Sequence, residues 1–357
     1  MSGGINYGNN SGMAVTSMGN NKLTWETADQ YDFGFDLGFW NGKLNMIADI
    51  YLKNTNNLLY SMPLHGTSGF TSITSNIGSM RNYGVEFSIN GHMNIGKVNW
   101  TSSFNISHNK NKLTKLLGDD LLPIGANRAL KVGKELGAFY LFQMDGLYQY
   151  DGEVPQPLYD LGVRAGDVKY HDVDNNGIIN DNDRVLTGSS NPDFFGGLNN
   201  TFKYKGFQLD VFFTYMYGND VYAEWAVTAT RPGYRMAITE DVAKNRWTAP
   251  GSSDKYPRAV NTLCGHNSKN STRFLEDGSF IRLRSLTFSY TFPQVMLQKI
   301  RLKGLRMYVQ GDNLLLFSKY SGWDPEVSKN MDPQFFGVDL YGVPPSRSVN
   351  FGINLSF

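Results

Sequence analysis

The sequence predicts an all-β protein: an antiparallel transmembrane β-barrel with long extracellular loops. The first observation is the end of the chain, where apolar residues occupy every second position from Val349 to Phe357. Neighbouring side chains of a strand point to opposite faces, so one face of this segment is apolar and the other carries small polar residues. An edge strand of a soluble sandwich has the same period, and alternation alone does not separate lipid from a packed core.

The composition is the second observation. The mean hydropathy is −0.36 and the sequence has no run of 18 apolar residues, which excludes a transmembrane helix. A barrel is compatible with this composition, because half of each spanning strand is polar. Aromatic residues make up 14% of the chain and 38 residues are glycine, which suits aromatic girdles, tight turns and long loops.

Charge and cysteine content exclude several classes of site. The chain has 33 basic and 32 acidic residues and a net charge of +1, so it lacks the basic footprint of a nucleic-acid-binding protein. Cys264 is the single cysteine, which excludes a disulfide within the chain and a cysteine-rich metal site.

Alternating segments recur along the chain as four hairpins and a final strand. A tight turn at Asn41-Gly42 joins the first pair, and similarly short turns join the second and third. In the first strand of the fourth pair the apolar phase changes, which predicts a β-bulge near Arg284 and Ser285. The nine predicted strands cover residues 31–39, 44–52, 83–93, 98–106, 198–204, 207–217, 281–292, 305–316 and 349–357.

The connections fall into two classes by length, as expected for short periplasmic turns and long extracellular loops. The sequence therefore predicts an extracellular loop remnant at residues 1–28 and a barrel portion at residues 29–357. Residues 136–150 also look like a strand, but a tenth strand there would invert the direction of those that follow, so we assign them to a loop. The predicted extracellular loops are about 55–81, 112–192, 219–278 and 318–346.

Nine strands do not make a complete bacterial barrel, in which single chains have even strand numbers. The first residues also contain neither a basic segment nor an apolar segment of a signal peptide. We therefore expect this sequence to be a fragment of a longer protein or to carry a misplaced start.

The alternation also predicts which side chains face lipid and which face the lumen. We expect the apolar set at the lipid: Phe33, Phe35, Phe87, Ile89, Phe104, Phe213, Phe288 and Phe351. We expect the polar set in the lumen: Asp36, Glu86, Asn105, Asp210 and Asn350.

Several short motifs then occur in order along nearly the whole chain. They are GNNKLTWET at 19–27, GDVKYHDVDNNG at 166–177, NPDF at 191–194, YKGF at 204–207, YGNDVY at 217–222, LTFSYTFP at 286–293, QGDNL at 310–314 and GWDPE at 322–326. The ordered set resembles the C-terminal half of SusC/RagA-type TonB-linked outer-membrane transporters.

This resemblance implies a barrel of about 22 strands in the bacterial outer membrane. It also implies an N-terminal plug that contacts TonB, a SusD-like surface lipoprotein over the barrel mouth, and import of an oligosaccharide or a peptide. This sequence contains neither the plug nor the TonB-contacting segment.

One segment has the spacing of a calcium-binding loop. From Asp172 to Asp183, oxygen side chains stand at loop positions one, three, five, nine and twelve, and glycine stands at six. Calcium takes six to eight oxygen ligands, and this spacing directs them to one point. The alternative is a turn rich in Asp and Asn whose side chains bond their own backbone. The predicted Ca²⁺ ligands are Asp172, Asp174, Asn176, the carbonyl of Ile178, Asn180 and Asp183.

We predict no enzymatic activity, because the five histidines are scattered and no nucleophile elbow or phosphate loop follows a strand. Two function classes stay open: a nutrient importer, and an adhesion or structural barrel without transport. Aromatic residues of the loops could stack on sugar rings, contact a partner or pack among themselves: Trp225, Tyr234, Trp247, Trp323, Phe335, Phe336 and Tyr341.

Overall fold

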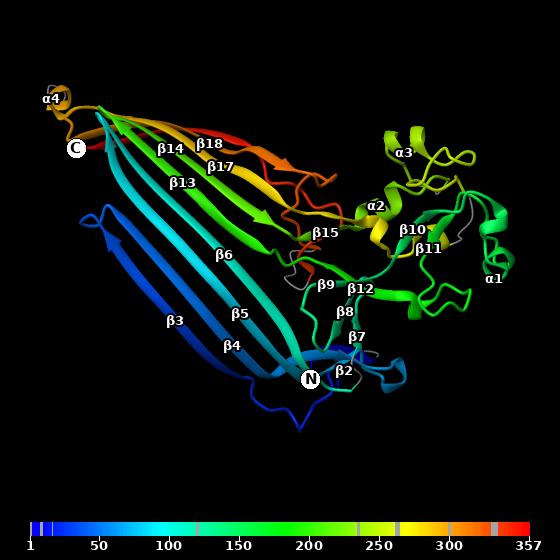
Figure 1. Ribbon diagram of the computed structural model, residues 1–357. Coiled ribbons are helices and arrows are strands. Elements are labelled where there is room, and N and C mark those ends of the chain that lie inside the picture. The colour runs from blue at the N-terminus through cyan, green and yellow to red at the C-terminus, as the bar shows by residue number, and fades with distance from the viewer. Residues whose placement is uncertain are drawn as a thin grey trace.

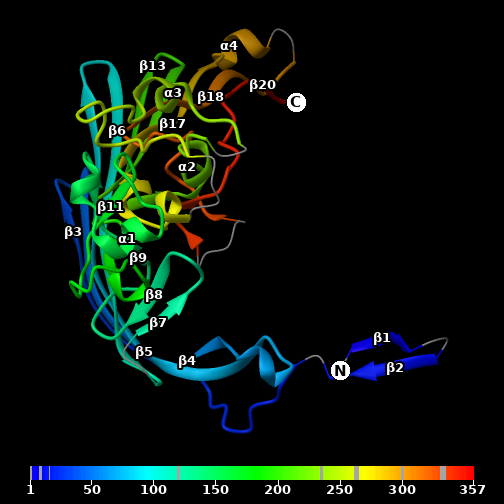
Figure 2. The same ribbon diagram turned by 90° about the vertical axis from the view of Figure 1, so that its right-hand side faces the viewer.

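Nine antiparallel strands form one continuous curved sheet (Figures 1 and 2). The computed structural model describes residues 2–7, 10–15, 17–118, 121–233, 236–260, 265–298, 301–329 and 335–357. Each strand of this sheet pairs only with the sheet strands that come directly before and after it in the sequence. The strands are β3 (Thr27–Phe39), β4 (Leu44–Pro63), β5 (Ser72–Ile95), β6 (Val98–Leu116), β13 (Phe194–Tyr204), β14 (Phe207–Tyr217), β17 (Phe280–Thr291), β18 (Gly304–Ser318) and β20 (Ser348–Ser356).

This sheet confirms the predicted fold class and the nine predicted strands. The segment 136–150 lies outside the sheet, as predicted, and forms β9 (Ala138–Phe142) and β10 (Met144–Leu147) of two smaller sheets. Among the residues that the structure describes, no helix is both long enough and apolar enough to cross a membrane.

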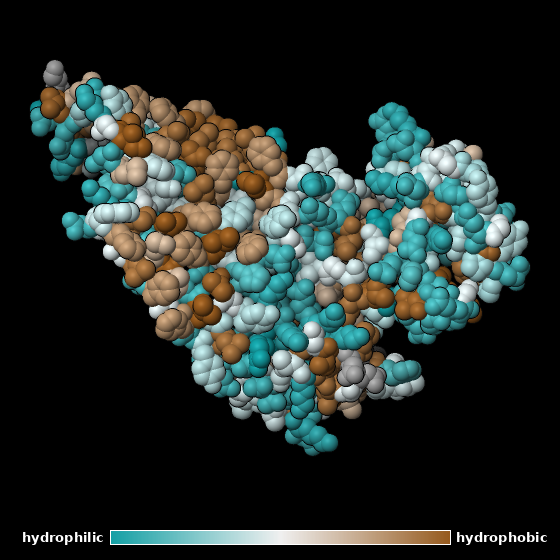
Figure 3. Space-filling view, viewed as in Figure 1, coloured by the Kyte–Doolittle hydropathy of each residue, from teal (hydrophilic) through white to brown (hydrophobic). Residues whose placement is uncertain are grey.

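Strand pairing separates the apolar and polar side chains onto opposite faces. One cross-strand row is apolar throughout: Met93, Trp100, Phe202, Leu209, Phe288, Val309 and Phe351. The row one residue away is polar: His92, Thr101, Thr201, Asp210, Thr287, Gln310 and Asn350. Every residue predicted to face lipid lies on the same face of the sheet as the apolar row. Every residue predicted to face the lumen lies on the same face as the polar row. Figure 3 shows apolar side chains gathered over the strands and polar ones over the loops.

The predicted β-bulge in β17 is confirmed. Ser285 pairs with Phe212 of β14 and Leu283 pairs with Phe213, so Arg284 is the extra residue between them. A bulge bends a strand and redirects one side chain. The redirected residue here is an arginine at the level where the loops begin.

The hairpin of β4 and β5 is longer than predicted. Its pairing continues to Pro63 and Ser72, so the connection is residues 64–71 and not 55–81. In this outer half the register shifts and side chains such as Ile77 pack against the loops, so the strict alternation ends although the hydrogen-bonded ladder continues. The register shifts at Thr55, Leu58 and Leu59 accompany a bend of this outer half, visible in Figure 2.

The loop residues form small sheets and short helices beside the large sheet. Residues expected in the loop remnant pair as β1 (Ser2–Tyr7) with β2 (Asn10–Ala14). The other strands are β7 (Leu121–Ile124), β8 (Arg128–Lys131), β11 (Val168–Tyr170), β12 (Arg184–Ser189), β15 (Asp220–Ala223), β16 (Leu275–Asp277) and β19 (Val338–Asp339). The α-helices are α1 (Gln156–Asp160), α2 (Glu224–Ala229), α3 (Glu240–Asn245) and α4 (Gln294–Leu297), and 3-10 turns occupy Gly66–Ser68, Asp151–Glu153, Asp181–Asp183, Gly265–Ser268 and Thr272–Phe274.

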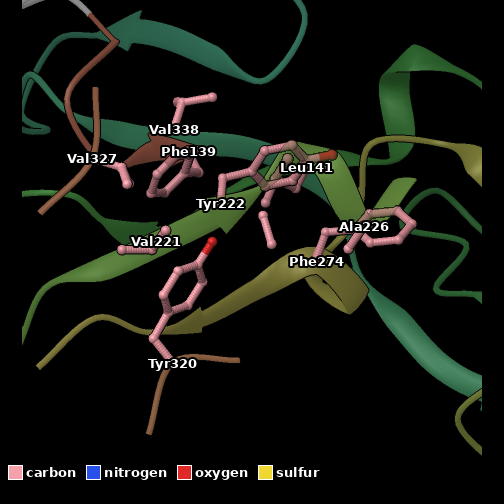
Figure 4. Close-up of a cluster of buried hydrophobic side chains, with 10 residues drawn as sticks. Phe139, Leu141, Val221, Tyr222, Ala226, Phe274, Tyr320, Val327 and Val338 are labelled. Atoms are coloured by element: carbon pink, nitrogen blue, oxygen red, sulfur yellow. The ribbon is translucent and has the colours of Figure 1, made fainter. Parts of the chain in front are cut away.

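Three of the four long connections share one hydrophobic core. Phe139 of β9, Tyr222 of β15 and Val338 of β19 are each fully buried and belong to the same cluster (Figure 4). A second cluster within residues 142–179 surrounds Val168 and Leu158. The loops are therefore folded bodies with cores of their own, and they hold their side chains in fixed positions.

Candidate functional site

The loop between β18 and β20 is fixed to the polar face of the sheet by buried charges. Arg282 of β17 donates to Asp324 at 2.6 Å and contacts Glu326 at 3.1 Å. Arg284, the bulge residue, contacts Glu326 at 2.8 Å. The Arg282 and Asp324 side chains are only 3% and 5% exposed. Each buried charge is therefore stabilised by the opposite charge of its partner. The contacts place the loop on the same face as Asp210 and Asn350.

A second buried network joins the loop between β6 and β13 to the loop between β14 and β17. Asp167 accepts two hydrogen bonds from Arg258, each 2.9 Å, and a third from Asn267 at 2.8 Å. His266 lies beside it, 2.7 Å from the carbonyl of Val168, and burial lowers the pKa of His266. A bidentate arginine pair fixes both position and orientation. The two loops therefore form one rigid rim.

Three of the predicted loop aromatics line one cavity. Trp225, Trp323 and Tyr341 surround a space of about 610 Å³, together with Thr239, Ser321 and Asp339. Trp323 is 80% exposed, so its ring is open to a ligand or a partner. Trp225 is fixed by a hydrogen bond from its Nε1 to the hydroxyl of Tyr320.

The remaining predicted aromatics lie elsewhere. Trp247 packs against the cluster around Val168, and Phe335 packs against the shared loop core. Phe336 lines a different, apolar cavity together with Arg128. Tyr234 lies outside the described residues, as does Cys264.

Arg128 is a site residue that no sequence motif indicates. Arg128 is the first residue of β8, its buried side chain donates to Ser190 just after β12, and burial lowers the pKa of Arg128 to about 10. The guanidinium therefore stays charged at neutral pH. The sequence does not indicate this residue, because the residues that surround its side chain come from distant parts of the chain. The folded structure brings them together where β8 meets the outer half of the β4–β5 hairpin.

The acidic loop folds so that three of its carboxylates converge. Oxygen atoms of Asp172, Asp174 and Asp183 all lie within 4.8 Å of one another. Gly177 has a φ of 77°, which allows the bend that the sequence predicted. The three residues range from exposed Asp174 to fully buried Asp183.

The loop's own backbone also bonds these oxygens. Asp172 accepts from the amides of Gly177 at 2.6 Å and Asn176 at 3.2 Å, and these bonds outweigh the effect of desolvation and lower the pKa of Asp172. Asp183 accepts from the amides of Val173 and Asn180.

The other predicted ligands make contacts within the loop. Asn176 accepts from the amide of Ile178 through Oδ1, and Asn180 caps the following turn by accepting from Asn182. Both sequence-based interpretations, a calcium loop and a self-bonded turn, thus have support in the geometry.

Comparison with known proteins gives consistent matches over nearly the whole chain. The family model described as TonB dependent receptor-like, beta-barrel matches residues 2–314. The TonB-dependent receptor P3 of Formosa agariphila is 33% identical, over 97% of this chain and 36% of that protein's length. The TonB-dependent receptor SusC of Bacteroides thetaiotaomicron is 29% identical, over 95% of this chain and 32% of its length.

Solved structures agree with these matches. The structure of the RagAB peptide transporter superposes with a TM-score of 0.83 and 25% identity, over 100% of this chain and 38% of the matched chain. The RagAB peptide importer in its open-open state gives a TM-score of 0.78 at 26% identity, over 100% and 37% of the two chains. This chain spans about a third of the length of these relatives.

Proposed function

The chain belongs to the TonB dependent receptor-like β-barrel family, and from this membership we propose that it forms part of the wall and vestibule of an outer-membrane nutrient importer. Its location is the outer membrane, as for its SusC and RagAB relatives. The observation that carries the proposal is that three loops share one hydrophobic core, and that Arg282 and Asp324 fix one of them to the polar face of the sheet. Loops held in this way can present a binding surface at the mouth of a barrel.

The proposal includes the partners that such an importer needs. Energy would come from TonB through a plug domain, and a SusD-like surface lipoprotein would bind at the loops. The substrate would be an oligosaccharide or a peptide, and no catalytic step is part of this role. An adhesion barrel would need neither energy coupling nor a substrate cavity, and the names of the relatives do not favour it.

Uptake measurements in cells test the proposal. Cells that carry the intact receptor should accumulate a labelled oligosaccharide or peptide, and accumulation should fall to background when TonB is deleted or the proton gradient is dissipated. Cells with the receptor gene deleted provide the baseline. If accumulation is equal in all of these strains while attachment to surfaces depends on the gene, the adhesion alternative is correct.

We also propose that the loop from Asp172 to Asp183 binds Ca²⁺ and is ordered by it. The supporting observation is the convergence of the carboxylates of Asp172, Asp174 and Asp183. Three carboxylates at this separation repel one another, and a divalent cation would remove that cost. The buried carboxylate of Asp183 adds to the preference, since burial of a charge is costly without a counterion.

Protease sensitivity in the presence of a chelator tests the calcium proposal. Extracellular calcium modules bind at roughly 10⁻⁴–10⁻³ M, so a chelator should empty the site and open the 112–192 loop to cleavage. Asp174→Ala with Asp183→Ala should remove the chelator effect. Asp181→Ala is the matched control, because the Asp181 side chain is 88% exposed and lies outside the converging group. If the intact receptor binds no calcium at millimolar concentration, the loop is a self-bonded turn.

A further inference from the structure

An apolar cavity of about 390 Å³ lies where the outer half of the β4–β5 hairpin meets β7, β8 and β9. Its walls are mostly aliphatic, with Leu58, Ile77, Leu113, Leu130 and Leu136 among the lining residues and Phe336 at one side. Ile77, Leu113 and Leu130 form a small buried cluster of their own, so this wall is firmly packed. The volume lies within the range of small-molecule sites, about 300–1,000 Å³.

One cation lines this apolar cavity. Arg128 is 6% exposed, and its guanidinium lies 4.7 Å from the centre of the Phe139 ring. Nη2 donates to the hydroxyl of Ser190 at 3.1 Å and to the carbonyl of Phe336. In the described part of the chain, Nε has no hydrogen-bond partner. Nη1 donates none of the hydrogen bonds found among the described residues, and the Arg128 side chain lines the cavity.

The charge of Arg128 has no anionic partner within the described residues. The salt bridges found among the described residues involve other cations, and Glu135, next to the lining residue Leu136, instead accepts from Asn191 at 3.1 Å. A buried arginine without a carboxylate is costly, because it loses hydration without gaining an ion pair. Asn111 adds a second polar group at the wall, and its Oδ1 accepts from the amide of Leu136 at 2.6 Å, which leaves Nδ2 to donate.

We propose that this cavity binds the C-terminal residue of a short peptide, with the carboxylate on Arg128 and an aliphatic side chain against the leucine wall. The proposal rests on the import function proposed above and specifies the substrate class for one subsite. Arginine pairs with a carboxylate through charge-assisted hydrogen bonds, and Nη1 is the donor for such a bond, because Nε is shielded and Nη2 already bonds Ser190 and Phe336. The aliphatic wall supplies the hydrophobic contribution.

The aliphatic lining of the cavity disfavours a uronic acid, which is another acidic ligand that a nutrient importer could take up. Each hydroxyl of a sugar ring needs a hydrogen-bond partner when it is buried, and this cavity offers few beyond Asn111, Ser190 and Asn191. An aliphatic side chain needs none. The chemistry of the lining therefore favours a peptide terminus.

Binding of matched peptides to the intact, purified receptor tests the proposal. The probe is Ala-Ala-Ala-Leu with a free carboxylate, compared by calorimetry with the same peptide as a C-terminal amide. The acid should bind at least tenfold more tightly than the amide, and Ala-Ala-Ala-Ser acid should bind less tightly than the leucine peptide. Equal affinity of acid and amide, tighter binding of a uronic acid oligomer, or no binding of any peptide would overturn the proposal.

Variants assign the effect to Arg128. Arg128→Gln should remove the difference between acid and amide, and Arg128→Lys should keep part of it. Lys131→Gln is the matched control, because Lys131 is an exposed cation on the same strand and does not line the cavity. The comparison of acid and amide on the unmodified receptor stands even if the glutamine variant does not fold.

The outcome is separable from that of the import proposal. If cells take up peptides through the receptor but acid and amide bind equally, the importer stands and this subsite is wrong. If the acid binds tightly but no nutrient is accumulated, the subsite stands and the import function is wrong.

Discussion

Arg282→Ala is expected to release the loop between β18 and β20 from the sheet. The variant leaves the buried carboxylate of Asp324 without its cation, and removing one partner of a buried pair costs about 3–5 kcal/mol. Opening of this loop should become more frequent by roughly two to three and a half orders of magnitude at 1.4 kcal/mol per factor of ten. Limited proteolysis of the folded receptor measures this, since cleavage follows the open population when reclosing is fast.

A charge-neutral double variant is the control for this experiment. Arg282→Met with Asp324→Asn removes both charges and keeps an acceptor for the amide of Glu326, which bonds Asp324 at 2.8 Å. Glu326 retains its pair with Arg284. The double variant should therefore resist protease far better than Arg282→Ala. If the single variant is as resistant as the unmodified receptor, the ion pair does not fix the loop.

Phe351→Arg is expected to impair assembly of the receptor in the membrane. Phe351 is 82% exposed on the apolar face of β20, opposite Val309. An arginine near the bilayer midplane on the lipid face costs about 2–4 kcal/mol. The amount of folded receptor in the outer membrane, measured by surface labelling and heat-modifiable migration, should fall severalfold.

Asn350→Arg tests the same strand on its other face. Asn350 donates to the carboxylate of Asp312 at 3.1 Å, so an arginine there meets an anion and water. This variant should assemble almost normally. Equal damage from the two substitutions would contradict the assignment of the faces.

The sheet was predictable because its signal is local. Alternation within nine or so residues, such as that of residues 349–357, reports which face meets lipid, and the turn at Asn41-Gly42 fixes the register of its hairpin. The bulge at Arg284 was predictable for the same reason, since a change of phase is visible in one strand. The end of the β4–β5 ladder was not, because the register shifts between Thr55 and Leu59 interrupt the alternation that marks a strand.

The chemistry of the loops was only partly predictable. The acidic loop was found because its residues lie within twelve positions of one another. Arg128, Arg258 and Arg282 gave no signal, because the hydrogen-bond partners of their guanidinium groups stand 42 or more positions away in the sequence. Long-range pairing depends on how folded loops pack against each other, and no local pattern encodes it.

The order of the large sheet has a consequence for how the chain folds. Because every strand pairs with its neighbours in chain order, the sheet can grow one hairpin at a time without threading a segment between strands already paired. The longest connection, from Leu116 to Phe194, adds only about 2–3 kcal/mol of closure entropy relative to a short turn. Its own hydrophobic cluster around Val168 would shorten the effective length further once formed. Folding speed should therefore depend on when this loop acquires its core, and less on the number of strands.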